Sequence, residues 1–262
     1  MKKPPESART KTITNWDLFK VFVASFFMQA VWNFRSLISI GFSVCLIPVL
    51  GKLCSSPEAK KEFLHRHLRF FNAHPYFASF ALGVSIRMEE MRANGEPHMP
   101  ETLDRLKDLL ISPLGAVGDR LFWATIKPAS LILGMLGILV APSVLTKVLV
   151  LIFTFLLYNI PHFYFRYRGL LEGYHHPMDI YKYVGQQRFN KLRKAYLYIF
   201  FFSIIGVIVA YSHHIFHLHP GLIAVFLISA LYSLFFNRIV KSFYWISLAT
   251  FVFFLAVGIL FF

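Results

Sequence analysis

Polar side chains beside aromatic rings interrupt the apolar parts of this sequence, and they are its strongest candidates for binding a ligand. Amide and carboxylate groups hydrogen-bond to the polar groups of a ligand, and an aromatic ring offers a flat face against which a ligand can pack. Ionisable groups at membrane depth are costly, which favours a function for those that lie between apolar segments. The candidate ligand-binding or path-lining residues are Gln29, Trp32, Asn33, Asn72, Glu89, Glu90, Gly115, Gly118, Asp119, Trp123 and Asn159.

Several of these residues also have a purely structural interpretation. Asp119 could be the N-cap of a helix, and the tryptophans could be anchors at the membrane interface. The pair Glu89 and Glu90 favours a solvated helix in which glutamate pairs with arginine over a catalytic dyad. Asn72 could cap the C-terminus of a helix.

Four histidines lie close together in the C-terminal third, at positions 213, 214, 217 and 219. His213 and His217 would share one face of a helix, as in a metal site. The segment breaks at Pro220, however, and no carboxylate supports the rings, so we expect an exposed polar loop. We predict no catalytic residue, no metal and no cofactor in this chain.

The composition is that of a polytopic membrane protein. The chain has 262 residues, of which 56% are hydrophobic, 18% aromatic and 15% charged. Its formal net charge is +14, which the excess of Lys and Arg on cytoplasmic loops of membrane proteins explains. We expect no nucleic-acid partner, because no nucleic-acid-binding motif accompanies the charge.

The pattern predicts an all-α integral membrane protein with about five transmembrane helices, re-entrant helical hairpin arms and interfacial amphipathic helices. The apolar runs 36–50 and 76–86 are too short to cross a bilayer, so we expect them to be the arms. Residues 17–31 and 101–111 are expected to be amphipathic helices. A third is expected to begin at Ser56 as N-cap and Pro57 and to end at 72–75, and Gly95 is the expected C′ residue of the helix after the second arm.

The predicted spans are 121–140, 144–164, 195–211, 221–236 and 242–262. A long basic loop at 165–194 marks the cytoplasmic side, which puts the N-terminus in the cytoplasm and the C-terminus on the opposite side. The chain then divides into a basic cytoplasmic tail (1–16), a core of broken helices and arms (17–185) and C-terminal transmembrane helices (186–262).

The stretch 112–123 organises this prediction. A proline and two glycines come immediately before a long apolar run. Irregular backbone is tolerated in a membrane only where it is buried in protein or lines a polar cavity. The sequence therefore predicts a broken entry to a membrane helix, with Asp119 at its N-cap, of the kind that transporters use to build a binding site.

These motifs resemble enzyme IID, the membrane subunit of mannose/fructose/sorbose-type sugar phosphotransferase systems. Residues 112–123 resemble its G-P-L-A-G-x-G-D-x-x-F-W signature, residues 29–34 its Q-G-S-W-N-F, residues 66–72 its R-H-L-E-F-F-N, and residues 88–94 its L-E-E-x-R-A-N. Asn159, Arg166 and Gly169 match a further motif. The resemblance covers residues 20–185; the departures are Ser112, Arg120, Arg69, Arg87 and His162.

The resemblance implies a non-catalytic membrane subunit of the bacterial cytoplasmic (inner) membrane. Its partners would be an enzyme IIC membrane subunit, in a trimer of IIC–IID pairs, and soluble enzymes IIA and IIB, which carry the phosphate. Its substrate would be a hexose, and its surroundings membrane lipid. Arg120 and the altered polar positions favour an alternative, a non-transporting scaffold or sensor that regulates metabolism through these partners. A metal transporter that uses the histidine segment is a third hypothesis.

Overall fold

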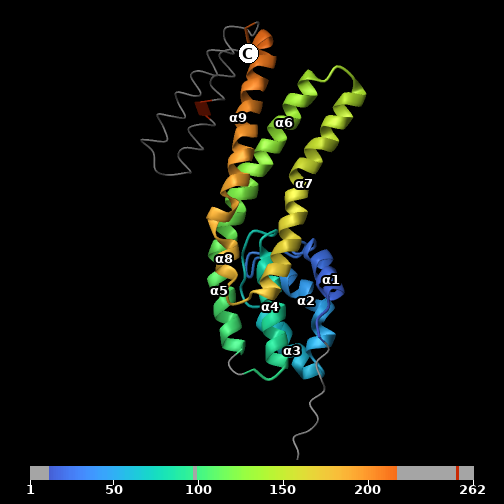
Figure 1. Cartoon of the computed structure of the whole chain (residues 1–262), viewed down its shortest axis with the longest axis vertical. Coiled ribbons are helices and arrows are strands. Elements are labelled where there is room, and N and C mark those ends of the chain that lie inside the picture. The colour runs from blue at the N-terminus through green and yellow to red at the C-terminus, as the bar shows by residue number, and fades with distance from the viewer. Residues whose placement is uncertain (1–11, 97–98, 217–251, 254–262) are drawn as a thin grey trace, which may run out of the picture. The chain divides into compact units, whose positions relative to one another are not determined.

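The structure is a computed structural model, and it describes residues 12–96, 99–216 and 252–253. The described residues form helices and loops without a strand (Figure 1), and the chain divides into two compact units, residues 1–204 and 205–262. Helix α9 passes from the first unit into the second. The helices are α1 (Asn15–Ser25), α2 (Ser39–Leu53), α3 (Pro57–His67), α4 (Ala78–Ala93), α5 (Met99–Gly118), the π-helix η1 (Asp119–Ile126), α6 (Lys127–Val140), α7 (Val144–His175), α8 (Ile180–Val184) and α9 (Gln186–Phe216).

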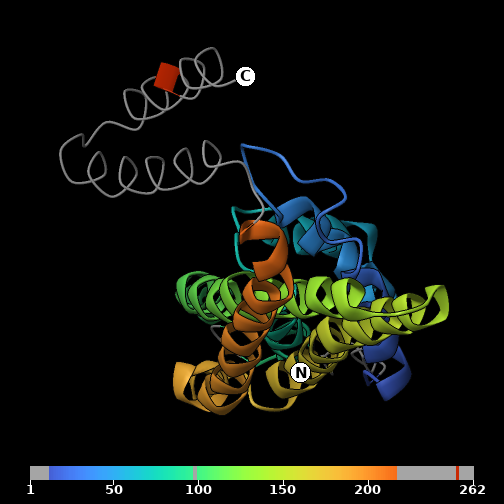
Figure 2. The ribbon, with the colours of Figure 1, turned by 90° about the horizontal axis from the view of Figure 1, so that it is seen from above.

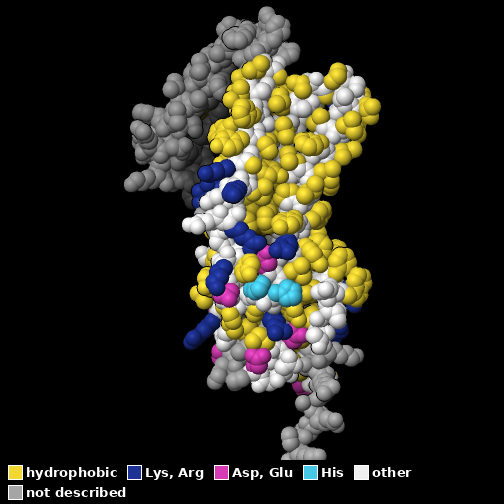
Figure 3. All heavy atoms as spheres, in the orientation of Figure 1, with side chains coloured by type: hydrophobic (Ala, Val, Ile, Leu, Met, Phe, Trp, Pro, Cys, Tyr) yellow, Lys and Arg dark blue, Asp and Glu magenta, His cyan; other side chains and the backbone are white. Residues whose placement is uncertain are grey.

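Three helical stretches of the described residues are long and apolar enough to cross a membrane: Glu101–Val140, Val144–His175 and Ile180–Tyr211. In the second, none of the most apolar window is buried in the protein. The α6–α7 hairpin extends beyond α1–α5, and apolar side chains cover the face of it seen in Figure 3. Such a surface needs lipid or another protein against it, which confirms the all-α membrane class and the first three predicted spans. Residues 221–236 and nearly all of 242–262 lie outside the described residues.

Helix α4 is the centre of the first unit. Twelve of its sixteen residues are buried, although it is one of the short apolar runs. Two glycines bring it against α7: a Cβ added to Gly83 would lie 2.1 Å from the carbonyl oxygen of Leu170, and one added to Gly173 would lie 2.1 Å from that of Phe80. Because neither position has room for a methyl group, backbone contacts at these two glycines fix the separation of the helices.

The N-terminal helices follow their local signals. The Ser56 hydroxyl accepts from the N–H of Ala59 at 3.1 Å and Pro57 opens α3, while Gly95 ends α4 with a φ of +87°. These predictions are confirmed. Helix α3, however, ends at His67, so the predicted end at 72–75 is wrong. Beyond it the backbone of Phe71 pairs with the preceding loop instead of continuing the helix.

The predicted break at 112–119 is wrong. Pro113 lies inside α5, and the chain continues without interruption through η1 into α6. Asp119 is therefore not an N-cap. The irregularity takes the form of a wide π-helical turn, in which the Thr125 hydroxyl donates to the carbonyl oxygen of Arg120 at 2.8 Å. Such insertions in α-helices are frequent at functional sites.

The predicted long loop at 165–194 is also wrong. Helix α7 continues to His175, and α8 and α9 occupy most of the remainder. Gly169, Leu170 and Gly173 are buried, because this part of α7 packs on α4 through the glycine contacts. Tertiary burial explains why a polar and basic segment stays helical.

Candidate functional site

Two loops meet on one side of the first unit: loop 26–38, between α1 and α2, and loop 68–77, between α3 and α4. Leu37 forms a bridge with Phe71, and the N–H of Ile38 donates to the carbonyl oxygen of Phe71 at 3.3 Å. The blue loop 26–38 extends from the helices in the view from above (Figure 2). Leu37 has a φ of +54°, a conformation that non-glycine residues rarely adopt and that concentrates at functional sites.

Asn33 organises loop 26–38. Its side-chain oxygen accepts from the N–H groups of Arg35 and Ser36 at 3.0 and 2.9 Å, and its side-chain nitrogen donates to the Ser36 hydroxyl at 3.0 Å. The Asn33 side chain thus makes hydrogen bonds to the loop backbone that a helix or a strand would otherwise provide. It leaves Gln29 and Trp32 exposed beside it, with the Trp32 ring 4.7 Å from that of Phe34.

Loop 68–77 packs on η1 through His74, whose ring stacks on Phe122 at 5.3 Å and lies 5.0 Å from Trp123. Gly118 permits this contact, because an added Cβ would lie 2.3 Å from the Cβ of His74. Nδ1 of His74 accepts from the N–H of Tyr76 at 3.3 Å, which places the ring proton on Nε2. That nitrogen is buried and has no hydrogen-bond partner among the described residues.

The other polar candidates around this contact are exposed. Asn72 precedes His74 by two residues and Asp119 follows Gly118 directly, and both side chains lie on the surface of the chain. Gly115 has open space beside it. Gly118 and Trp123 therefore contact His74, whereas Asn72 and Asp119 are exposed and only neighbour these residues in the chain. The Leu37–Phe71 bridge joins loop 68–77 to the loop that carries Gln29, Trp32 and Asn33.

Below this surface lies a buried polar cluster around Arg166. Its guanidinium donates to Nε2 of His162 at 3.1 Å and to the Ser25 hydroxyl at 3.0 Å, and also to the carbonyl oxygen of Ser25. The rings of Phe26 and Tyr76 lie 4.7 and 5.1 Å from it. Tyr76 in turn stacks on His162 at 3.7 Å. Sequence analysis did not identify this cluster, because its members come from four segments and share no local pattern.

Glu89 is fully buried and holds three side chains from α3 and α4. Arg66 donates to its two oxygens at 2.9 and 3.0 Å, Arg92 donates at 2.7 Å, and Nε2 of His67 lies 3.2 Å from Oε1. Burial alone would raise the pKa of Glu89, but the hydrogen bonds from His67 and Arg66 outweigh it and lower the pKa to about 2. The expected pairing of glutamate with arginine is confirmed, whereas the expected solvated helix is wrong.

Glu90 joins two other parts of the chain, the segment at Ile13 and helix α7, and also pairs with Arg87 of its own helix. One oxygen accepts from the N–H of Ile13 at 3.2 Å, and the other accepts from Arg87 at 2.8 Å and from the Tyr174 hydroxyl at 2.7 Å. Protein groups thus hold the carboxylates of both Glu89 and Glu90, and these carboxylates lie apart from the loop surface.

The Glu89 cluster predicts that acid destabilises the fold. Burial lowers the pKa of His67 from 6.5 to about 4, against the opposing hydrogen bond to Glu89. Between pH 6.5 and 4, His67 therefore binds a proton in the unfolded chain but not in the folded chain. Glu89 does the same between pH 4.5 and 2, so both groups lower the free energy of unfolding as the pH falls. We expect the free energy of unfolding in detergent to fall by about 1–3 kcal/mol from pH 7 to pH 4.5.

The matched controls are two histidine variants of α3. His67→Gln should reduce the pH dependence of the unfolding midpoint without abolishing it, because burial also lowers the pKa of His74 to about 3. His65→Gln, at an exposed position, should leave the pH dependence as in the unmodified chain. Equal slopes in all three proteins would contradict the assignment.

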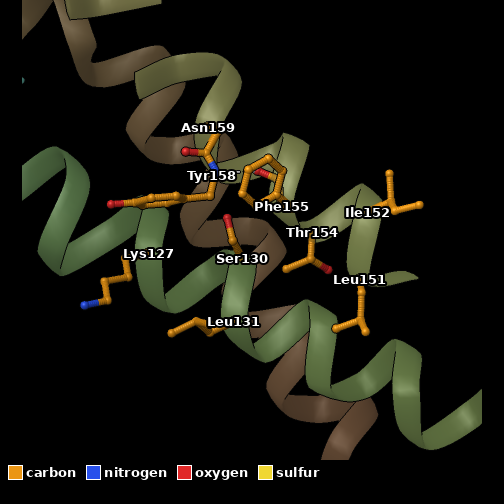
Figure 4. Close-up of a pocket in the computed structure, with 9 residues that line it drawn as sticks. All are labelled: Lys127, Ser130, Leu131, Leu151, Ile152, Thr154, Phe155, Tyr158 and Asn159. Carbon is orange, nitrogen blue, oxygen red and sulfur yellow. Dashed lines mark hydrogen bonds between the residues drawn. The ribbon is translucent and has the colours of Figure 1, made fainter. Parts of the chain in front are cut away.

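Asn159 lies elsewhere, in a groove of about 600 Å³ between α6 and α7 (Figure 4). Its side-chain nitrogen donates to the carbonyl oxygen of Phe155 at 2.8 Å. The other lining side chains are mostly apolar and include Leu131, Ile152 and Phe155. This groove belongs to the apolar surface of the hairpin and adjoins loop 68–77, because the hydroxyl of Tyr158 in its lining shares a 2.7 Å hydrogen bond with that of Tyr76.

Comparisons with known proteins agree on one family. Residues 12–215 match the model described as the PTS system mannose/fructose/sorbose family IID component. The chain is 34% identical over 205 residues to the mannose-specific EIID component of Escherichia coli K12, which covers 78% of this chain and 69% of that protein. It is 32% identical over 207 residues to the fructose permease IID component of Bacillus subtilis, with 77% and 69% covered.

Two solved structures are similar along nearly the whole chain. A chain from the complex of the mannose transporter ManYZ with microcin E492 aligns with a TM-score of 0.58 at 29% identity, covering 95% of this chain and 96% of that one. A second, described only as a membrane protein, aligns with a TM-score of 0.69 at 30% identity, with 94% and 97% covered.

Proposed function

This chain belongs to the mannose/fructose/sorbose family of phosphotransferase IID components, and we propose that with an enzyme IIC subunit it forms a path for hexose uptake. Uptake is coupled to phosphorylation by the soluble subunits: enzymes IIA and IIB carry the phosphate, and this chain carries none. The assembly is a trimer of IIC–IID pairs in the bacterial cytoplasmic membrane. The basic N-terminal tail faces the cytoplasm, and the C-terminus lies on the opposite side.

One observation supports the proposal: His74 of loop 68–77 packs on Phe122 and Trp123 of η1, and a backbone bridge joins its loop to loop 26–38. Asn72 and Asp119 are exposed close to these residues in the chain, and Nε2 of His74 has no hydrogen-bond partner among the described residues. A polar surface of this kind in a membrane subunit needs a partner, a water-filled space or a substrate. A IIC subunit that covers it would enclose these groups in a shared path.

We assign the side chains of this surface different roles. Asp119 and Asn72 supply hydrogen bonds to sugar hydroxyls, and Trp32 or Trp123 supplies a face for the ring. Gly118 has a positioning role because it admits His74, and Asn33 holds its own loop. Glu89, Glu90 and Asn159 have structural partners and lie outside the proposed sugar site.

The alternative function is a scaffold or sensor without transport, and the residue that favours it is Arg120. It places an exposed cation immediately after Asp119, where it could alter the charge that a sugar encounters. A scaffold needs contact with its partner subunits but no saturable hexose site.

Uptake of labelled hexose separates the two functions. In cells that contain the matching IIA, IIB and IIC proteins, we expect Asp119→Asn and Asn72→Ala each to reduce uptake by about tenfold, since the first replaces a charged hydrogen-bond acceptor with a neutral amide and the second removes the amide group. Asp108→Asn, an exposed aspartate on α5, is the matched control and should be neutral. Unchanged uptake in both site variants, at equal membrane levels, would favour the scaffold.

A further inference from the structure

A second cavity, of about 210 Å³, opens between the lower part of α7 and the first turns of α9. One wall is aromatic: Phe80 from α4, Tyr164 and Phe165 from α7, and Phe189 from α9. The opposite end is polar and contains Arg168, Glu172 and Arg188. The cavity thus combines a surface suited to hydrocarbon with a pair of guanidinium groups.

Two cations share one carboxylate at the polar end. Arg188 donates to both oxygens of Glu172, at 2.6 and 2.9 Å, whereas Arg168 donates through Nη2 alone, at 3.1 Å. The Glu172 side chain is 7% exposed, but that of Arg168 is 48% exposed and that of Arg188 is 37% exposed. The trio carries a net positive charge, and most donors of Arg168 remain available to an anion from outside.

The surroundings add positive charge at the same level of the molecule. Lys191, Arg193 and Lys194 follow Arg188 on α9, and the sequence contains no Asp or Glu after Asp179. In Figure 3, Lys and Arg side chains gather along the lower edge of the apolar surface. Tyr164, at the upper end of the cavity, belongs to the exposed apolar stretch of α7. The cavity therefore lies where the hydrocarbon region gives way to headgroups on the basic side of the membrane.

We propose that this cavity binds an anionic phospholipid, with its phosphate between Arg168 and Arg188 and the start of an acyl chain against the aromatic wall. A planar guanidinium fork suits phosphate oxygens, and basic residues at this depth attract anionic lipid. The proposal depends on membrane insertion, which the family assignment supports, and is independent of the sugar path. Loss of lipid binding and loss of hexose uptake are consequently separate results.

Removing the negative charge of Glu172 should strengthen lipid binding. This carboxylate competes with a bound phosphate for both arginines, so Glu172→Gln should strengthen binding of phosphatidylglycerol by about fivefold. Arg168→Gln should weaken it by about fivefold, because it removes one phosphate-binding cation and leaves the Arg188–Glu172 fork in place. Lys182→Gln is the matched control: it also removes one positive charge, but Lys182 is paired with Asp179 at 2.7 Å and does not line the cavity.

Binding is measured by native mass spectrometry of the full, delipidated chain in detergent, titrated with phosphatidylglycerol or phosphatidylcholine. We expect preference for the anionic lipid in the unmodified chain, opposite shifts in the two cavity variants and no shift in the control. If Glu172→Gln does not fold, the lipid affinities of Arg168→Gln and Lys182→Gln can still be compared and still test the proposal. Equal affinity in Arg168→Gln and the unmodified chain would overturn the proposal, and so would tighter binding of inorganic phosphate than of phosphatidylglycerol, which would identify a site for free phosphate.

Discussion

Gly173→Ala should strongly destabilise the native fold of this protein. The new Cβ would lie 2.1 Å from the carbonyl oxygen of Phe80 and 3.0 Å from the backbone nitrogen of Val84. Both obstacles are backbone atoms of the buried helix α4, so no side chain can rotate away, and α4 and α7 must separate. Overpacking of a rigid contact costs about 1–3 kcal/mol and sometimes more. We expect the upper end of this range, seen as a large loss of monodisperse protein and a lower unfolding midpoint in detergent.

The control is a helical glycine with space around it. An added Cβ at Gly51 in α2 meets no atom within 4 Å, so Gly51→Ala should be neutral or stabilise by up to about 1 kcal/mol through helix propensity. Gly83→Ala, on the other side of the same contact, should behave like Gly173→Ala. If Gly173→Ala were as stable as Gly51→Ala, the close packing of α4 and α7 would be refuted.

These contacts also mark the limit of what the sequence could predict. Local signals were sufficient where a helix end depends on a few neighbouring residues: the cap at Ser56 and Pro57 and the C′ glycine at position 95 are confirmed. Apolar runs long enough to cross a bilayer were sufficient for α6, most of α7 and residues 195–211 of α9. Each of these features depends on interactions within about one helical turn or on bilayer thickness.

The wrong predictions concern segments whose structure or burial depends on residues far away in the sequence. Pro113 with two glycines reads locally as a break, but packing holds the chain helical and a π-helical turn absorbs the irregularity. The polar sequence at 165–175 reads as a loop, but α4 buries its glycine face. Glu89 reads as solvated, but Arg66, 23 positions earlier, pairs with it in the interior. Of the candidate residues, those grouped around His74 were chosen from motifs, and only the fold brings them side by side.

Arg166→Met should cost about 2–4 kcal/mol of stability and loosen loop 26–38. Arg166 is buried, with 3% of the residue exposed, and its guanidinium donates to the carbonyl oxygen of Ser25, the last residue of α1. A cation at this position stabilises the negative, C-terminal end of the helix dipole. Hydrogen bonds to a charged group contribute about 1.5–3 kcal/mol each, and cation–π contacts with Phe26 and Tyr76 add to them.

Arg166→Lys distinguishes the geometry from the charge. A lysine keeps the positive charge, but it cannot reach His162 and Ser25 together with a planar fork, so we expect it to recover less than half of the lost stability. Arg105→Met, at an exposed position on α5, is the control and should be neutral. Trypsin provides a local measurement, because Arg35 lies exposed in loop 26–38 and should be cleaved faster once the loop is released from α7. Full rescue by lysine would mean that charge alone matters, and unchanged cleavage at Arg35 in Arg166→Met would show that the cluster does not hold the loop.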